Sequence, residues 1–240
     1  MSDQVQLPPA AAIRAVAALE DDLRQAMYDF IRTSRQPVTR EQASEAVGIS
    51  RKLAAFHLDK LVAAGLLRSD FEPIGRRRVG RAPKAYSPVD ADIRVSLPER
   101  QHDVLAAILI DGVLSEGRDE TAEQAVLRAA EHRGRTLAET ERAQLRPGRL
   151  GTERALTLSA DLLARHGYQP DRVSATRICL RNCPFHPVSR QSPQLVCGLN
   201  QAFLTGFLHG LEASTVEAVL EPRPGECCVE LRQRDEPAGP

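Results

Sequence analysis

The segment from Pro37 to Leu67 constrains the fold more than any other part of the chain. Two short amphipathic helices are expected there, one on each side of a turn at Gly48. Thr39 can cap the first helix, and Gln42 lies three residues later as the second member of a capping box. Gly48 can end that helix because glycine tolerates the left-handed backbone of a helix C-terminus. The segment therefore predicts a helix–turn–helix.

The second helix of this pair begins after Ser50, which can act as its cap, and ends at Gly65. Its buried face is expected to hold side chains at helical spacing, namely Ala54, Leu58, Leu61 and Val62. Its first two turns expose the opposite face, which carries Arg51, Lys52, Ala55 and Phe56. A cationic outer face with small side chains is typical of a helix that enters the DNA major groove. An ordinary helical hairpin is the alternative.

The residues that follow favour the DNA-binding interpretation. Leu66–Pro73 and Ala82–Ser87 are expected to pair as a β-hairpin, or wing, whose segment carries the cations Arg68, Arg76, Arg77, Arg78, Arg81 and Lys84. Such a hairpin can hold phosphates or insert arginine into a minor groove. A flexible basic loop is the alternative, but a helix–turn–helix followed by a basic hairpin is more specific than either part alone.

The charge is segregated along the chain, although the net charge is zero. Residues 31–94 carry thirteen Arg or Lys against seven Asp or Glu, which gives +6, while residues 1–30 and 95–240 each carry −3. A local basic block indicates a polyanionic partner, here a double-stranded DNA operator. The predicted DNA-binding residues are Thr39, Arg40, Ser50, Arg51, Lys52, Ala55, Arg76, Arg77, Arg78, Arg81 and Lys84.

The rest of the chain predicts an α+β protein of two domains. A winged helix–turn–helix domain is expected over residues 12–90, and a domain of helices packed on a small antiparallel sheet over residues 98–232. Its helices are expected at Glu99–Ser115, Asp119–His132, 152–166 and 193–211, with residues 133–151 irregular. Its strands are expected at Val173–Leu180, Thr215–Leu220 and Cys227–Leu231, and Gly206 and Gly210 favour close helix packing.

All five cysteines lie in the last 62 residues, spaced C-x3-C-x13-C-x29-C-C. Cys179 and Cys183 have the same parity along an extended segment, so they can face one side. Cys197 falls in the first turns of a helix, where the helix dipole favours a thiolate. Cys227 and Cys228 are neighbours on an expected strand and would point to opposite faces, so only one of them fits a single site. Cys227 is preferred because it shares the parity of apolar residues.

Three or four thiolates gathered in this way can hold an iron–sulfur cluster or a zinc ion. The predicted ligands are Cys179, Cys183, Cys197 and Cys227, with Cys228 as the substitute for Cys227. Three alternatives remain open. The cysteines can be small buried hydrophobic residues, they can sense oxidants directly, or they can line a pocket for a small organic ligand between the sheet and the helices.

The chain resembles the ArsR-like winged-helix regulators of the SufR type, which repress genes of iron–sulfur cluster assembly. The resemblance covers residues 12–232 and depends on ISRKLAAFHLDKLVAAGLL with GRAPKAY, on NCPFHPVSRQSPQLVC and on PRPGECC. It implies a homodimeric transcriptional repressor whose DNA affinity depends on a cluster. The matching ligands here are Cys183, Cys197 and either Cys227 or Cys228, with Cys179 as the candidate fourth.

Other classes of protein are disfavoured. The sequence contains no GxSxG, Walker or HExxH motif, so an enzyme is not expected. The N-terminal residues lack the cationic start and apolar core of a signal peptide, and no apolar run reaches membrane-spanning length. We therefore expect a cytoplasmic protein with reduced thiols and no membrane partner.

Overall fold

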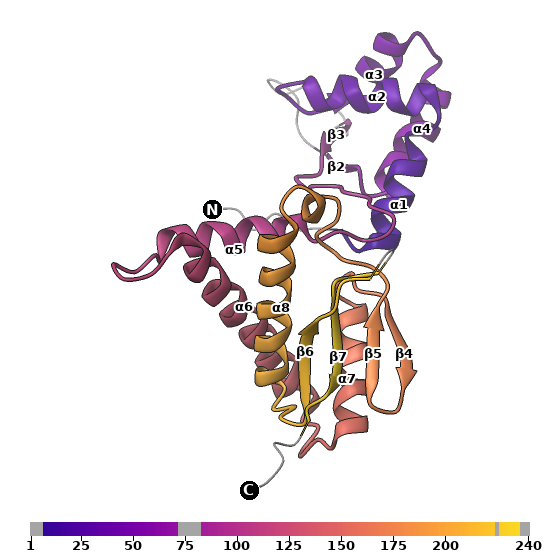
Figure 1. Ribbon diagram of the computed structural model, residues 1–240. Coiled ribbons are helices and arrows are strands. Elements are labelled where there is room, and N and C mark those ends of the chain that lie inside the picture. The colour runs from indigo at the N-terminus through magenta and orange to yellow at the C-terminus, as the bar shows by residue number, and fades with distance from the viewer. Residues whose placement is uncertain (1–6, 72–82, 224–225, 236–240) are drawn as a thin grey trace, which may run out of the picture. The chain divides into compact units, whose positions relative to one another are not determined.

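The computed structural model describes residues 7–71, 83–223 and 226–235. The chain divides into two compact units, residues 1–95 and residues 96–240. The described residues form eight α-helices, one 3-10 helix and two small antiparallel sheets, so the protein is mixed α+β (Figure 1). Within the same residues, no helix is both long enough and apolar enough to cross a membrane.

The first unit contains four helices and a three-stranded sheet. The helices are α1 (Pro9–Ala18), α2 (Asp22–Thr33), α3 (Arg40–Val47) and α4 (Arg51–Ala63). The sheet has the order β1-β3-β2, with β1 at Val38–Thr39, β3 at Lys84–Pro88 and β2 at Leu67–Phe71. The hairpin of β2 and β3 was expected, whereas β1 was not. Val38 pairs with Tyr86, so the start of α3 is tied to the hairpin.

The predicted caps of α3 and α4 are confirmed. Thr39 and Gln42 form the capping box, and Gly48 ends α3 in the left-handed conformation with φ 73°. The hydroxyl oxygen of Ser50 accepts a hydrogen bond from the backbone N–H of Leu53 at 3.3 Å. The core beneath these helices is formed by fully buried side chains, among them Met27, Ile31, Leu58, Leu61 and Tyr86.

The second unit packs helices against a four-stranded sheet. The helices are α5 (His102–Leu114), α6 (Ala122–Leu145), α7 (Thr152–Ala164) and α8 (Pro193–Gly210), with a 3-10 turn η1 at Val188–Arg190. The sheet has the order β4-β5-β7-β6, formed by Pro170–Ser174, Arg177–Leu180, Val229–Gln233 and Val216–Leu220. In Figure 1, α6 and α8 run side by side, and α7 lies against the sheet.

Helix α6 is longer than the sequence predicts. It continues to Leu145, whereas an irregular segment was expected from residue 133 onward. Gly134 does not interrupt it, because this glycine serves the packing of α6 against α8. A Cβ atom on Gly134 would overlap the backbone carbonyl of Phe203, and one on Gly206 would overlap the carbonyl of Glu131. The two backbones therefore approach more closely than any side chain would allow.

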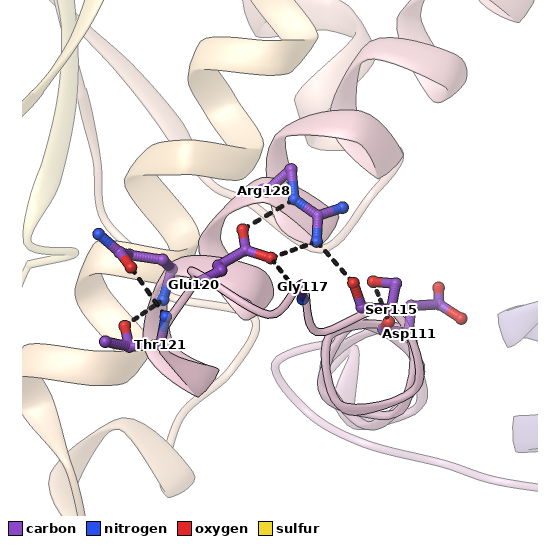
Figure 2. Close-up of polar contacts among 7 residues, drawn as sticks. Asp111, Ser115, Gly117, Glu120, Thr121 and Arg128 are labelled. Atoms are coloured by element: carbon purple, nitrogen blue, oxygen red, sulfur yellow. Dashed lines mark hydrogen bonds and ion pairs between the residues drawn. The ribbon is translucent and has the colours of Figure 1, made fainter.

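The turn between α5 and α6 is fixed by one arginine (Figure 2). Arg128 donates to both carboxylate oxygens of Glu120, at 2.9 and 2.7 Å, and to the backbone carbonyl of Ser115 at 2.9 Å. The backbone N–H of Gly117 donates to Glu120 as well, at 3.2 Å. These hydrogen bonds, that of Arg128 first, lower the pKa of Glu120. Thr121 then caps α6 through a second capping box.

The expected single strand over Val173–Leu180 is wrong. The chain forms two strands there, β4 and β5, which pair with each other in antiparallel fashion and place Asp171 opposite Cys179. The β5 strand ends at Leu180, so Cys183 lies beyond it in a turn. The parity rule that related Cys179 to Cys183 does not apply, because side chains alternate only within one continuous strand.

Candidate nucleic-acid interface and thiol cluster

Two cations open helix α4 in the first unit. Arg51 and Lys52 occupy its first turn, directly after the cap Ser50, and both are exposed. Arg51 forms an ion pair with Glu41 of α3, and both side chains are more than half exposed. An exposed pair of this kind stabilises a fold by about 1 kcal/mol at most. The guanidinium can therefore exchange the carboxylate for another anion at little cost.

An exposed aromatic side chain lies on the same helix. Phe56 is 55% exposed, and the ammonium of Lys60 lies 5.6 Å from the centre of its ring. Phe56 is not among the DNA-binding residues predicted from the sequence, although it was assigned to the outer face of α4. It shares the exposed face of α4 with Leu53 and with the cations Arg51 and Lys52, and phenylalanine is one of the residues that contact thymine methyl groups.

The other predicted residues of α3 and α4 have different surroundings. Arg40 is exposed at the first position of α3, and Ala55 is half-buried. Thr39 uses its hydroxyl within the capping box, since it accepts from the backbone N–H of Gln42 and donates to the side chain of that residue. Thr39 therefore orients α3 and has no free hydroxyl proton for a phosphate.

Lys84, predicted to hold DNA, is engaged within the first unit. Its ammonium donates to Asp59 of α4 at 2.9 Å and lies 5.2 Å from the centre of the Tyr86 ring. The hydrogen bond to Asp59 raises the pKa of Lys84. Lys84 thus joins strand β3 to helix α4. Four further predicted contacts lie outside the residues that the structure describes: Arg76, Arg77, Arg78 and Arg81.

The second unit brings four of the five cysteines together. Cys183 lies in the turn after β5, Cys197 in the first turns of α8, and Cys227 and Cys228 immediately before β7. The thiol of Cys227 is hydrogen-bonded to Cys183, and that of Cys228 to Cys197. The expectation that only Cys227 or Cys228 could join the site is wrong. Neither lies within a strand, so strand alternation does not separate them.

Cys183 has the surroundings of a stabilised thiolate. Cys227 donates to its sulfur, and so do the backbone N–H of Phe185 and the hydroxyl of Ser189, while the backbone N–H of His186 donates to the carbonyl of Cys183 and adds its dipole beside the sulfur. These hydrogen bonds, that of Cys227 first, lower the pKa of Cys183 to about 7 although burial opposes them. The same contact with Cys183, together with burial, raises the pKa of Cys227. When the pair loses a proton, the negative charge therefore lies on Cys183 and the remaining proton stays on Cys227.

The pKa of Cys197 is shifted in the direction opposite to the one predicted. The start of α8 was expected to favour its thiolate, but the pKa of Cys197 is raised to about 12. Burial is the main cause, and the neighbouring thiol of Cys228 and the charge of Cys183 add to it. The helix dipole acts over the first turn only and is outweighed here by the loss of solvent.

A polar framework holds the thiol cluster of Cys183, Cys197, Cys227 and Cys228 in place. The amide of Asn200 donates to the sulfur of Cys227 at 3.2 Å and accepts from the hydroxyl of Tyr168 at 2.6 Å. Arg100 donates to the backbone carbonyl of Cys183 and to the side chain of Asn182, both at 2.7 Å. The cluster is therefore positioned by side chains from α8 and from the segments before α5 and β4.

Cys179 belongs to a different group of side chains. It is buried on β5 opposite Glu230, to whose carboxylate its thiol donates at 3.6 Å. Arg223 lies 3.4 Å from the same carboxylate. Burial, and after it the charge of Glu230, raises the pKa of Cys179. Of the predicted ligands, Cys179 therefore lies with Glu230 and apart from the thiol cluster, whereas Cys228, predicted as the substitute for Cys227, lies within it.

The thiol cluster can be compared with the requirements of a metal group. Among the residues that the structure describes, no three or more His, Cys, Asp or Glu side chains surround a common point as ligands of one ion. A structural zinc ion takes four ligand atoms about 2.0–2.3 Å from one centre. A cluster of several irons is larger and takes four thiolates, and the donor set of Cys183, Cys197, Cys227 and Cys228 fits that chemistry.

A comparison of the chain with models of protein families, with curated proteins and with solved structures finds no match.

Proposed function

We propose that this protein is a homodimeric, DNA-binding transcriptional regulator, a repressor of the SufR-like, ArsR type, with a winged helix–turn–helix in its first unit. Its DNA affinity is set by the thiol cluster of its second unit. The observation that carries the DNA-binding proposal is the surface of α4, where Arg51, Lys52 and Phe56 are exposed beside one another after a firmly capped start.

The roles of these side chains follow from their chemistry. Arginine at the start of a recognition helix can make a bidentate contact to guanine, and phenylalanine can contact a thymine methyl group. Lys52 and Arg40 are placed at helix starts and are suited to phosphates. The bond between Lys84 and Asp59 supports this arrangement because it fixes the base of the hairpin against α4.

Replacement of Arg51 by glutamine is expected to weaken binding to specific DNA by about 1–3 kcal/mol, roughly tenfold to a hundredfold. A DNA duplex that binds the wild-type protein is first selected from a pool of random sequences. The affinity of each variant for this duplex is then measured by fluorescence anisotropy. Arg32→Gln is the matched control, since it removes the same charge from an exposed position on α2. An equal loss in both variants, or a pool in which no sequence is enriched, would exclude α4 as the reading element.

For the sensor, we propose that Cys183, Cys197, Cys227 and Cys228 hold an iron–sulfur cluster. When bound, such a cluster supplies a redox-active group whose potential depends on its charge, its hydrogen bonds and its exposure to solvent. The chain contributes the four sulfurs, and the N–H groups of Phe185 and His186 stabilise negative charge on Cys183. Hydrogen bonds to the sulfurs are among the features that tune a cluster's potential.

Anaerobically purified protein is expected to be brown and to contain iron and acid-labile sulfide. Cys183→Ser and Cys228→Ser should each lose most of both, because each removes one of four ligands. Cys179→Ser is the matched control and should keep them, since this thiol lies with Glu230. Circular dichroism establishes that the variants fold. If the Cys228→Ser variant kept its iron and sulfide while the Cys179→Ser variant lost them, this ligand set would be contradicted.

Direct thiol oxidation is the second candidate for the signal, and one observation favours it. Cys183 has a pKa of about 7 and contacts Cys227, so a thiolate and a partner thiol are already adjacent. In that case the anaerobic protein is colourless, and mild oxidation removes two free thiols per chain. Iron and sulfide analysis therefore separates the two mechanisms.

Support for a dimer comes from helix α5. It exposes Ile110, Val113 and Leu114, the last at 80%, at spacings of three and four residues. An exposed apolar stripe of this kind is suited to the same stripe on a second copy. A two-fold dimer reads two half-sites, so its affinity depends on the spacing of the two α4 helices. A change at the thiol cluster would act by altering that spacing.

A further inference from the structure

A small cavity lies beside the thiol cluster and is separate from it. It has a volume of about 170 Å³ and lies between the start of α5, α6, α8, the turn after Cys183 and the segment before β4. Its walls are mainly apolar and include Leu137, Phe203, Phe185 and Tyr168. The last three are almost completely buried, so the walls exist before any ligand arrives. An engineered cavity of about 150 Å³ accepts benzene, which sets the size of a suitable apolar group.

The cavity also contains polar groups that are poorly satisfied. Nε2 of His166 is shielded from water and has no hydrogen-bond partner among the described residues, since the nearest carboxylate oxygen, of Glu141, is 3.9 Å away. Arg133 lies at the same cavity, and its ion pair with Asp111 is long, at 3.4 Å, and solvent-exposed. A buried nitrogen without a partner is costly and is relieved by a ligand atom that bonds to it.

These two groups define the polar part of a ligand. The side chain of Arg133 is 43% exposed and reaches solvent, whereas that of His166 is 29% exposed and its Nε2 is shielded from water. Burial lowers the pKa of His166, although the charges of Glu141 and Glu99 oppose it, and this favours the neutral ring, which carries one N–H. Arginine is the side chain best suited to a carboxylate.

We propose that this cavity binds a small monocarboxylic acid with an aromatic or branched apolar body. The body fills the space between Phe185 and Phe203, and the carboxylate bonds to Arg133 and to His166.

Two residues that line the cavity also connect it to the thiol cluster. Tyr168 lines the cavity, and its hydroxyl donates to Asn200, whose amide donates to the sulfur of Cys227. Phe185 also lines the cavity, and its backbone N–H donates to Cys183. A ligand that displaces Tyr168 therefore also moves Asn200, whose amide is in contact with the thiol cluster. This link between the cavity and the thiols depends only on contacts within the second unit, so it can be tested whether or not the protein binds DNA.

Calorimetric titration of the full chain with benzoate tests the proposal. Benzyl alcohol serves as a neutral probe of similar shape. Benzoate is expected to bind the wild-type protein, and Arg133→Gln should weaken it at least tenfold, because a hydrogen bond to a charged group is lost. Arg135→Gln on the same helix, which removes an exposed charge paired with Glu131, should leave benzoate binding unchanged. Benzyl alcohol should bind both variants and the wild type alike.

A second variant tests the location of the apolar body. Leu137→Phe reduces the cavity from within α6 and should abolish binding of benzoate and benzyl alcohol, while thermal unfolding verifies that the variant is folded. The absence of binding by both probes at millimolar concentration, or equal losses in Arg133→Gln and Arg135→Gln, would overturn the proposal.

Discussion

Raising the salt concentration from 50 to 200 mM is expected to weaken DNA binding by about 10³–10⁵-fold, as for a dimer that neutralises roughly 6–10 phosphates. Each neutralised phosphate releases condensed counterions, and this release contributes less when the surrounding salt concentration is high. The cations concerned are concentrated in residues 31–94, which carry +6 in a chain of zero net charge. In a dimer this basic segment is present twice.

The measurement is the slope of log K against log salt, obtained by fluorescence anisotropy with the enriched duplex. Replacing Arg76, Arg77 and Arg78 by glutamine should make the slope shallower by about 0.9 for every phosphate contact removed. Arg51→Gln should instead change sequence preference, because a contact to a base edge carries the information on sequence. A flat salt response in the wild-type protein would refute DNA binding through this basic segment.

The second large effect concerns the crossing of α6 and α8. Gly206→Ala is expected to destabilise the second unit by about 3 kcal/mol, at the upper end of the usual cost of overpacking. The added Cβ would overlap the backbone carbonyl of Glu131, which is part of a helix and cannot rotate away. Alanine's higher helix propensity offsets about 1 kcal/mol of the steric cost at most, so the net effect remains destabilising.

Gly198→Ala is the matched control on the same helix. A Cβ there would meet only a methyl group of Leu127 at 3.6 Å, an ordinary contact. This variant should be neutral or more stable by up to about 1 kcal/mol, because alanine favours the helix. The free energy of unfolding is measured by urea titration followed by circular dichroism. Equal effects of the two substitutions would mean that the helices do not approach as closely as described.

Local features of the fold could be predicted from the sequence. The capping box of Thr39 and Gln42, the cap at Ser50 and the left-handed Gly48 depend on residues within one or two turns of each other. The buried face of α4 was predictable because helical spacing alone defines which residues share a face. Gly206 and Gly210 were correctly assigned to close packing, since a helix tolerates glycine poorly without such a reason.

Features that depend on distant segments were predicted less well. The sequence did not indicate that β1 joins the hairpin or that Lys84 bonds to Asp59 twenty-five residues away. It suggested an end for α6 near Gly134, because the reason for that glycine lies in α8. The cavity also escaped prediction, since its walls come from five separate segments.

The cysteines show most clearly the difference between features that follow from local sequence and features that depend on contacts between distant segments. Their number and their confinement to the last 62 residues already indicated a thiol site, and both are properties of the sequence alone. Which thiols meet depended on where β5 ends and β7 begins, and one residue of difference in a strand reverses the direction of a side chain. Cys228 therefore joined the cluster and Cys179 faced Glu230, because strand boundaries are set by hydrogen bonds between segments some fifty residues apart.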